Sequence, residues 1–456
     1  MRQYRLKLAA LKRKLKLKDK RIEELEAENR ILAHELAKVR AKLFGRKTKD
    51  KEKPTGKPKK KGAPKGHPGW FRKKPDAADK EIELCPKKCP NCGSSNINKY
   101  NRKEEHIVED IVVPKVKVTK YIRYYGYCKD CHKVFRPKGA DELFRSYIGP
   151  TAKAFAAYLK YKVKVSDRDI ADLFKKMFNL EIDPSSISGF RNQLRRAGYP
   201  LYRKLLKSLK NSPYINADET GWSLDGINHW LWNFSNKNIS ITHIDRSRGS
   251  RVIEDILGKK YGGVLISDFL AAYNKIEAKA KQKCIVHLKR YILKAKEHFE
   301  GDSSILRYLS RLDSLIDYAI SLKEDYLKGK IKAKEFNKKR EDMVDQIGDF
   351  SFPHPQKGIL STLAKRLKKH GDSLFTFLYH DVPWHNNHAE QQIRPHVLLR
   401  KITFGNRSKK GIVNHSIISS IIQTAKLNNA DCYKILKKVL LKDTKVEDLL
   451  PLIRSP

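Results

Sequence analysis

The first 44 residues carry apolar side chains at alternating spacings of three and four positions. The first position of each heptad is held by Leu8, Leu15, Ile22, Asn29, Leu36 and Leu43. A seven-residue period sustained this long predicts a coiled coil over residues 1–44; a single amphipathic helix packed on its own domain is the alternative. Asn29 at a core position fixes the register of a parallel dimer, so we expect a homodimer or a higher oligomer.

The apolar period ends at Gly45, and residues 45–80 are rich in Lys, Pro and Gly. Such a composition cannot bury enough apolar surface to fold, so it predicts a disordered basic linker. The linker follows a DNA backbone or serves as a solvated tether, and the two roles are compatible.

Residues 81–145 contain two C-x-x-C pairs, Cys89 with Cys92 and Cys128 with Cys131. Residues 106–127, between the pairs, alternate in a way typical of ribbon strands. Four thiolates on two tight turns can complete a tetrahedral site, so the segment predicts a zinc ribbon with a structural Zn²⁺. A redox dithiol is the alternative, but it needs only one such pair.

Residues 146–210 show helical periodicity in two amphipathic segments, and Ser185 or Ser186 can cap the second one. The exposed face of that second segment carries Ser188, Arg191, Asn192, Arg195 and Arg196. A recognition helix in a DNA major groove presents such a face, and a plain helical spacer is the alternative. We therefore predict a helix-turn-helix-like DNA-binding module that contacts DNA through Arg191 and Arg195.

From residue 211 onward, apolar and polar residues alternate with a period of two, which is typical of strands. The segments that read as strands are residues 213–220, 229–236, 239–246 and 263–269, with 283–288 as a fifth. Asp225-Gly226 is a hairpin turn between the first two, and residues 250–260 read as a helix. Three strands, a helix and a further strand match the order of a ribonuclease-H-like sheet, whose first part is expected over residues 211–289.

Three carboxylates lie where such a sheet brings distant residues together. Asp218 and Asp268 each end an apolar run, whereas Glu390 lies in a helical pattern after a charged helical insertion over residues 290–380. Residues 381–456 are expected to complete the core. Carboxylates converging at one sheet edge bind hard cations such as Mg²⁺ or Mn²⁺. Two ions about 3.5–4 Å apart can bind the attacking and leaving oxygens of a phosphodiester, whereas each carboxylate alone is compatible with an ordinary surface position.

The composition of the chain narrows the class of partner. Its 456 residues have a formal charge of +47, from 98 Lys and Arg against 51 Asp and Glu. This excess predicts a polyanionic partner, since basic side chains that neutralise phosphates release counterions; a generally basic protein of ribosomal type is the alternative. The chain has no apolar run long enough for a membrane span and no secretory signal. The seven cysteines suit a reducing compartment, and Cys284 and Cys432 are expected to be packed thiols.

Five motifs carry a resemblance that extends over nearly the whole chain. They are ADETGW, SDFLAAY, NNHAEQQIRP, IIQTAKLNNAD and a C-x-x-H-x-x-R stretch at Cys284, His287 and Arg290. Together they resemble transposases of the insertion sequence 66 family. The resemblance implies a multidomain α/β protein with an N-terminal zipper, a zinc finger, a helical region and a DDE catalytic core with a helical insertion. It implies that Asp218, Asp268 and Glu390 are the catalytic metal ligands.

The chain departs from the family pattern at three positions near these motifs. Val286 replaces an aromatic residue, Lys289 replaces one of two adjacent Arg residues, and His388 occupies a position where a small residue is commoner. His287 and Arg290 either orient DNA, or His287 is a packed core residue.

The resemblance implies a DNA transposase that cleaves the ends of its insertion sequence and transfers them into target DNA. Its partners are expected to be double-stranded DNA, further copies of itself and accessory proteins, in the prokaryotic cytoplasm near the nucleoid. The expected DNA contacts near the active site are His287, Arg290, Arg394, Arg400, Lys401 and Arg407. A non-catalytic DNA-binding protein derived from a transposase and a ribonuclease-H-like nuclease are the alternatives.

Overall fold

The computed structural model describes residues 77–82, 87, 89–96, 107, 116–137, 139, 141–143, 146–348 and 358–450. The predicted coiled coil over residues 1–44 and most of the predicted linker lie outside these residues. The chain divides into two compact units, residues 1–110 and residues 111–456, and each is described by itself. Among the described helices, none combines the length and the apolar content that crossing a membrane requires.

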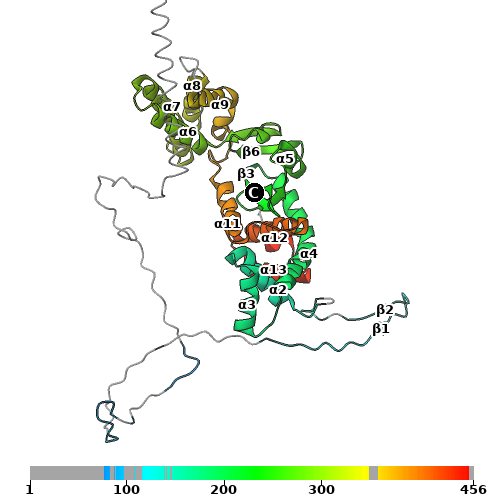
Figure 1. The fold of residues 1–456 in the computed structure, drawn as a ribbon. Coiled ribbons are helices and arrows are strands. Elements are labelled where there is room, and N and C mark those ends of the chain that lie inside the picture. Colours follow the sequence, from blue (N-terminus) through cyan, green and yellow to red (C-terminus); the bar gives the residue numbers. More distant parts are fainter. Residues whose placement is uncertain are drawn as a thin grey trace, which may run out of the picture. The chain divides into compact units, whose positions relative to one another are not determined.

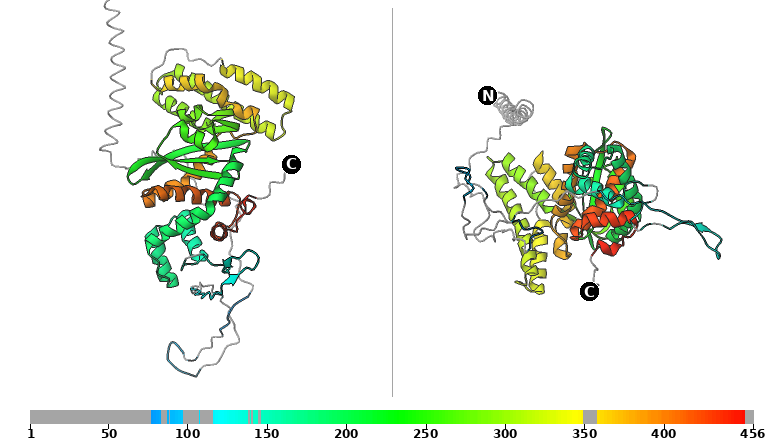
Figure 2. Two further views of the ribbon diagram at one scale, coloured as in Figure 1. Left: turned by 90° about the vertical axis from the view of Figure 1, so that its right-hand side faces the viewer. Right: turned by 90° about the horizontal axis from the view of Figure 1, so that it is seen from below.

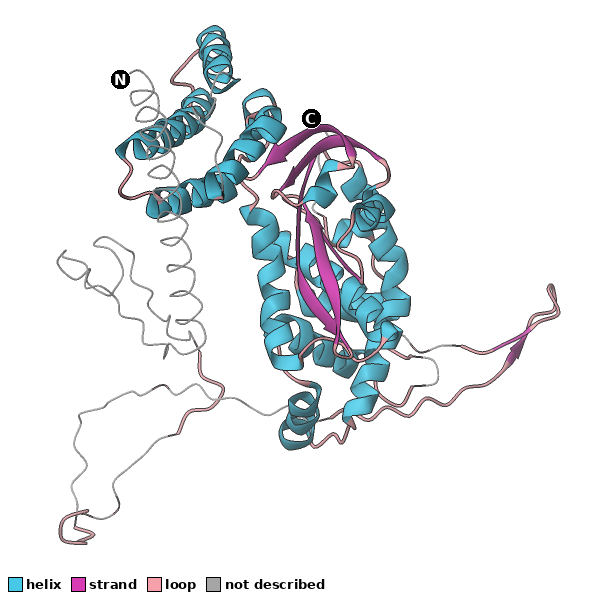
Figure 3. Ribbon diagram, turned by 45° about the horizontal axis from the view of Figure 1, so that its top comes forward, coloured by secondary structure: helices cyan, strands magenta, loops and turns pink. Residues whose placement is uncertain are grey.

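A five-stranded mixed sheet forms the centre of the second unit (Figure 3). Its strands are β3 (Tyr214–Leu224), β4 (Ile227–Ser235), β5 (Ser240–Asp245), β6 (Lys260–Ser267) and β7 (Glu277–Lys283). They lie in the order β5-β4-β3-β6-β7. The first three strands form an antiparallel meander, and β6 and β7 run parallel to β3. The first predicted strand, residues 213–220, is thus part of the central strand β3, and the fourth, residues 263–269, is part of the neighbouring strand β6.

The hairpin between β3 and β4 turns where the sequence predicts. Leu224 pairs with Ile227, and both residues between them have positive φ, 52° at Asp225 and 79° at Gly226. An Asp-Gly pair tolerates this left-handed backbone, which matches the twist of the two strands. The predicted helix that follows the meander is also present, as α5 (Ser250–Leu257).

The prediction of a fifth strand at residues 283–288 is wrong. The fifth strand is β7, which ends at Lys283, and helix α6 (Ile285–His298) begins two residues later. The apolar side chains Ile285, Leu288 and Ile292 all lie on the buried face of α6. Their spacing of three and four positions fits a helix, whereas a short apolar run alone does not separate a strand from a buried helix.

The edge strand β5 is covered by helix α12 (Lys409–Leu427), which also packs against α4 (Pro184–Lys210) (Figure 1). The N–H of Thr242 donates to the hydroxyl of Ser420 at 2.8 Å, and the N–H of Ser240 donates to Thr424 at 3.1 Å. Two hydroxyls spaced one helical turn apart thus satisfy strand groups that have no neighbouring strand. An edge covered in this way is not free to pair with another chain.

The region predicted to be a helical insertion contains α6, α7 (Ser303–Leu327), α8 (Ala333–Gly348), α9 (Ile359–Leu374) and α10 (Thr376–Tyr379). These helices share a hydrophobic core of their own and stand at one end of the sheet (Figure 2). The insertion leaves and re-enters the core at neighbouring points, because the N–H of Ile285 donates to the carbonyl of Trp384 at 3.1 Å.

The region before the sheet is helical, as predicted, with α2 (Pro150–Tyr158), the π-helical turn η1 (Leu159–Val163), α3 (Asp167–Phe178) and α4. The predicted cap of α4 is wrong in detail. Asp183, rather than Ser185 or Ser186, is the N-cap residue, and its carboxylate accepts a hydrogen bond from the N–H of Ser185 at 2.7 Å. A carboxylate also complements the positive end of the helix dipole, which a hydroxyl cannot do.

The predicted ribbon strand before Cys128 is much shorter than its alternating pattern suggests. Within the described part of this region, β1 (Gly126–Tyr127) pairs with β2 (Val134–Phe135), and residues 116–125 form no regular strand. Val118 and Tyr124 are 90% and 83% exposed. Alternation produces a stable strand only where a partner strand and an apolar cover are present.

Candidate active site

The sheet register brings Asp218 and Asp268 to the same edge. Asn216 of β3 lies opposite Ile266 of β6 in the parallel pair, and each Asp is two residues further along its own chain. Since alternate residues of a strand share a face, the two carboxylates lie beside each other on one side of the sheet. The sequence predicts this convergence from the ends of two apolar runs; in the structure Asp268 follows β6, whereas β3 continues past Asp218 to Leu224.

Helix α11 (Asn387–Thr403) supplies Glu390, and Asn386 attaches the start of this helix to the central strand. The fully buried amide of Asn386 donates to the carbonyl of Ala217 at 2.8 Å and accepts from the side chain of Asn216 at 3.0 Å. These two bonds fix the first turn of α11 against the strand that carries Asp218. This role of Asn386 cannot be recognised in the sequence, although the residue lies within the NNHAEQQIRP motif.

The electrostatics of Asp218 show that the predicted carboxylates are neighbours. Burial is the largest cause that raises the pKa of Asp218 to about 8, and the negative charges of Glu219, Asp268 and Glu390 also raise it. The Oε1 atom of Glu390 is buried and has no hydrogen-bond partner. The cluster therefore concentrates negative charge around a buried carboxyl group, as expected of a site for metal ions.

The three carboxylates form an open group rather than a single tight cage. Among the described residues, the oxygens of Asp218, Asp268 and Glu390 do not all fall within 4.8 Å of one another. Ligands of one ion must lie closer together than ligands shared between two ions. Asp218, Asp268 and Glu390 therefore do not form a single-ion cage in this structure.

Glu219, next to Asp218, is a fourth carboxylate that the sequence analysis did not single out. Both Nε and Nη2 of Arg248 donate to its Oε1, at 3.1 and 2.8 Å, and the hydroxyl of Tyr273 donates to its Oε2 at 2.7 Å. Its side chain is only 2% exposed. Although burial raises the pKa of Glu219, these partners satisfy both of its oxygens. Glu219 is thus a structural ion-pair residue, and it adds negative charge beside Asp218.

The loop that carries Asp268 is held by a buried lysine. Lys283 is 1% exposed, and its ammonium donates to the carbonyl of Asp268 at 2.8 Å and to Ser267 Oγ at 3.1 Å. Burial lowers the pKa of Lys283 to about 8. The Oδ1 atom of Asp268 accepts from the N–H of Leu270 at 2.9 Å. These contacts fix the backbone and one oxygen of Asp268 at the end of β6.

The C-x-x-H-x-x-R stretch reaches the same site from the start of α6. His287 Nδ1 lies 3.8 Å from Glu390 Oε1, and Arg290 Nη2 lies 3.9 Å from Glu390 Oε2. Cys284 is fully buried, as predicted, and burial raises the pKa of its thiol. Burial also lowers the pKa of His287. His287 is therefore a neutral imidazole at pH 7, and it lies beside Glu390 rather than in an apolar core.

The cations predicted to contact DNA near the site occupy different environments. Arg394, Lys401 and Arg407 are exposed, whereas Arg400 donates a hydrogen bond to the carbonyl of Gly221 in β3. Arg400 therefore attaches the end of α11 to the central strand. The three exposed cations remain predicted phosphate contacts.

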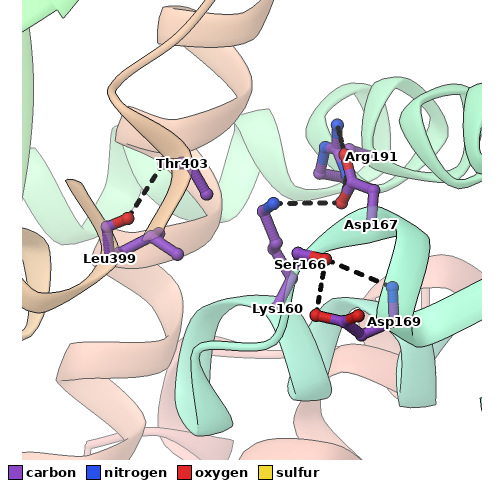
Figure 4. Close-up of polar contacts among 7 residues, drawn as sticks. All are labelled: Lys160, Ser166, Asp167, Asp169, Arg191, Leu399 and Thr403. Atoms are coloured by element: carbon purple, nitrogen blue, oxygen red, sulfur yellow. Dashed lines mark hydrogen bonds and ion pairs between the residues drawn. The ribbon is translucent and has the colours of Figure 1, made fainter. Parts of the chain in front are cut away.

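The two arginines of the predicted recognition helix face other parts of the protein. Arg191 forms a two-bond ion pair with Asp167, at 2.7 and 3.0 Å, and Lys160 pairs with the same carboxylate at 3.1 Å (Figure 4). Arg195 has a buried Nε atom without a hydrogen-bond partner. Arg191 thus stabilises the packing of α4 on α3, and its predicted contact with DNA remains a prediction.

The two C-x-x-C pairs form turns of the same kind. The N–H of Cys89 donates to Ser94 and that of Cys128 to Lys133, each five residues on, at 2.8 and 3.0 Å. Gly93 and His132, at equivalent positions, both have left-handed backbone and donate back to the first cysteine of each pair. Backbone N–H groups of the turns lower the pKa values of Cys89 and Cys128. Such turns favour thiolates, the form in which cysteine binds zinc.

A comparison with protein families gives one match, to a family described as Transposase IS66 family, over residues 145–414. The matched range is more than half of the 456 residues, and it includes the helical region, the sheet, the insertion and α11. All three carboxylates of the site lie within it. No curated protein matches the chain.

Proposed function

The chain belongs to the Transposase IS66 family, and we propose that it cleaves DNA at the ends of an insertion sequence and joins those ends to target DNA. The convergence of Asp218, Asp268 and Glu390 on one edge of the sheet carries this proposal. The strand order supports a ribonuclease-H-like core, in which the first and fourth strands lie side by side.

The acidic cluster fits Mg²⁺ or Mn²⁺. Its donors are carboxylate oxygens, which hard cations prefer. Oε1 of Glu390 is buried without a hydrogen-bond partner, and the pKa of Asp218 is raised. A bound cation would stabilise both carboxylates in their charged forms. Asp218, Asp268 and Glu390 would hold the ions through their carboxylate oxygens. When bound, the ions activate the attacking oxygen and stabilise charge on the phosphodiester.

The protein itself contributes positioning and charge. Asn386 and Arg400 attach the two ends of α11 to β3, and Lys283 fixes the backbone of Asp268. Reacting groups held at fixed distances lose little further entropy in the transition state. Arg290, 54% exposed beside Glu390, and Arg394 are available to contact the DNA phosphates that approach the site. Water, or the 3′-hydroxyl of a cut DNA end, would attack phosphorus in line. The P–O3′ bond on the opposite side would break, its 3′-oxygen would leave and take up a proton, and no protein group would be bonded to phosphorus.

The first prediction concerns Asp218→Asn, which removes a metal ligand while preserving the shape of the side chain. Cleavage of labelled DNA carrying the ends of the encoding element, with Mg²⁺ present, should fall by at least about 10³-fold, on the scale of losing a main electrostatic contributor to catalysis. Binding to the same DNA should change less than about threefold. The matched control is Asp255→Asn on α5, an exposed carboxylate paired with Arg251, which should cleave normally. Cleavage by the Asp218→Asn protein at the wild-type rate would contradict the assignment.

A strand-transfer assay separates the proposal from its two alternatives. With a DNA end that is already cut, a transposase joins the end to a target, whereas a ribonuclease-H-like nuclease does not. A non-catalytic DNA-binding protein binds the ends and performs neither reaction.

We further propose that the protein binds double-stranded DNA, holds a structural zinc ion and assembles into oligomers. The formal charge of +47 and the family membership support binding to double-stranded DNA. The equivalent turns at the two C-x-x-C pairs support a structural zinc ion held by Cys89, Cys92, Cys128 and Cys131. The heptad pattern of residues 1–44 supports assembly into a dimer or larger oligomer.

A further inference from the structure

A second cluster of metal-binding side chains adjoins the acidic site and differs from it in chemistry. One ligand atom each from Cys284, His287 and Glu390 all lie within 4.8 Å of one another. The sulfur lies just before α6, the imidazole in its first turn, and the carboxylate in the first turn of α11. Among the described residues, no other set of three Cys, His, Asp or Glu ligands lies this close together.

Two of these three donors are buried and lack a hydrogen-bond partner. They are Nδ1 of His287 and Oε1 of Glu390, which lie 3.8 Å apart. A buried polar atom left without a partner is costly, and an unplaced ion is one of the recognised explanations for it. The side chains themselves are only 26% and 28% exposed, so water has limited access to them.

The third donor is arranged in the same way as a metal-binding thiolate. Cys284 is fully buried, and its Sγ accepts a hydrogen bond from the backbone N–H of Asn386 at 3.2 Å. Backbone N–H groups that point at the sulfur orient it and oppose the larger effect of burial, which raises the pKa of the thiol. A bound cation would favour the thiolate. The same Asn386 attaches α11 to β3, so the thiol and Glu390 share one rigid support.

The distances suit a tetrahedral ion after a small closure of the group. Zinc bond lengths of about 2.3 Å to sulfur and about 2.0–2.1 Å to nitrogen or oxygen place two ligands about 3.3–3.6 Å apart. The observed N–O separation of 3.8 Å is close to this range. One sulfur, one nitrogen and one oxygen select a thiophilic ion over Mg²⁺, which binds oxygen and dehydrates reluctantly.

We propose that Cys284, His287 and Glu390 form a binding site for a thiophilic divalent cation of the zinc class, distinct from the acidic site but sharing Glu390 with it. Three protein ligands leave one coordination position open to water or to a DNA phosphate oxygen. An ion in this site draws on the same carboxylate that completes the acidic cluster. Zinc therefore competes with Mg²⁺ for Glu390 and inhibits cleavage; this consequence rests on the proposed function, whereas the site itself does not.

The site is tested by metal content, measured on the full-length chain after zinc loading and extensive dialysis. Cys284→Ser and His287→Ala should each bind one zinc equivalent fewer than the wild type. The matched control is Cys432→Ser, which alters the other buried thiol among the described residues, on α13 (Cys432–Leu441). Because only the difference is used, the ions held by other cysteines do not affect the result.

Cobalt substitution gives a second readout that needs no DNA. The Co²⁺ form of Cys284→Ser should lose part of the sulfur-to-cobalt absorption in the near ultraviolet, whereas the Cys432→Ser form should keep it. Equal metal content and equal spectra in all four proteins would overturn the proposal. An equal loss in Cys432→Ser would also overturn it, because the loss would then report unfolding.

Competition for Glu390 is tested separately with Mg²⁺-dependent cleavage. Added Zn²⁺ should inhibit the wild type, and raising Mg²⁺ should reverse the inhibition. If the variants lose metal but zinc does not inhibit, the site stands and the competition is disproved. If the wild type cleaves no DNA, the proposed function fails, while metal content still decides the site.

Discussion

Asp218 links the chemistry of the site to the stability of the protein. In the metal-free fold its pKa is raised to about 8, mainly by burial and then by neighbouring negative charge, against an ordinary value of about 3.9. Between about pH 4 and pH 8 the folded state therefore holds a proton that the unfolded state has released. The free energy of unfolding consequently falls as pH rises through this window. A cation that binds Asp218 must displace this proton.

A second prediction follows for metal binding and stability. The apparent affinity for Mg²⁺ should rise by up to about tenfold per pH unit below pH 8, since one proton is released on binding. With Mg²⁺ omitted, Asp218→Asn should melt at a higher temperature than the wild type, and the gap should widen from pH 6 to pH 8.5. Calorimetric Mg²⁺ titrations and thermal melts measure the two effects. Melting curves that shift in parallel with pH would disprove the linkage.

At the residue scale, the sequence predicts the three carboxylates but not the groups that hold them. Asp218 and Asp268 are visible because each follows an apolar run, although Asp218 lies inside β3 and not at its end. Asn386, Lys283 and Glu219 act through contacts with residues far away in the chain. No local pattern distinguishes such a side chain from an exposed polar one, so the fold must be known before these roles appear.

Asn386 is the residue through which helix α11 is placed against the sheet, and its loss gives a third prediction. Asn386→Ala removes two buried hydrogen bonds and leaves the amide of Asn216 and the carbonyl of Ala217 without these partners. The free energy of unfolding should fall by about 2–4 kcal/mol. Cleavage should fall by more than DNA binding, because Glu390 loses its fixed position. Urea unfolding and the cleavage assay measure the two effects.

Asn428→Ala is the matched control for that experiment. Asn428 ends α12 and donates to the carbonyls of Asn238 and Thr424, on the side of the sheet where β5 lies. Its loss should lower stability and leave cleavage by the remaining folded protein unchanged. Equal losses of cleavage per folded molecule in the two variants would show that Asn386 has no special role in the site.

The cover of the edge strand gives a fourth prediction at the scale of elements. Thr424→Val preserves the shape of the side chain but leaves the buried N–H of Ser240 without its acceptor, so stability should fall by about 1–3 kcal/mol. Ser416→Ala on the same helix is the control. Ser416 donates to the carbonyl of Ile412 within its own helix, so its removal should cost less. Urea unfolding compares the two; a larger loss for Ser416→Ala would contradict the role of Thr424.

Strong periodicity predicts elements well, and weak periodicity does not. The β3–β4 hairpin and the helices of residues 150–210 follow from clear patterns and turn residues. Strand β7 has the sequence EAKAKQK, which contains no β-branched or aromatic residue. It forms a strand because β6 offers its hydrogen-bonding edge. This tertiary effect overrides local preference, and it explains why the prediction chose the more apolar segment that follows.

At the scale of the whole molecule, we expect the basic charge to bind DNA ends and the heptads of residues 1–44 to bring two bound ends together. Deleting residues 1–44 should reduce the pairing of two DNA ends more than the binding of a single end, since the shortened chain keeps its basic linker and core. Gel-shift experiments with one and with two labelled ends measure this fifth prediction. Equal losses in both assays would show that the heptad segment does not bring the ends together.

The way in which the helical insertion is attached to the core affects which of its helices can diverge during evolution. The insertion departs and returns at neighbouring points, where the N–H of Ile285 donates to the carbonyl of Trp384. Its last two helices, α9 and α10, are also bonded to β7, through Gln282 and Thr376. Among the described residues, helices α7 and α8 make no such bonds to β7, so they are freer than α9 and α10 to diverge over evolution or to acquire new partners without moving the acidic cluster.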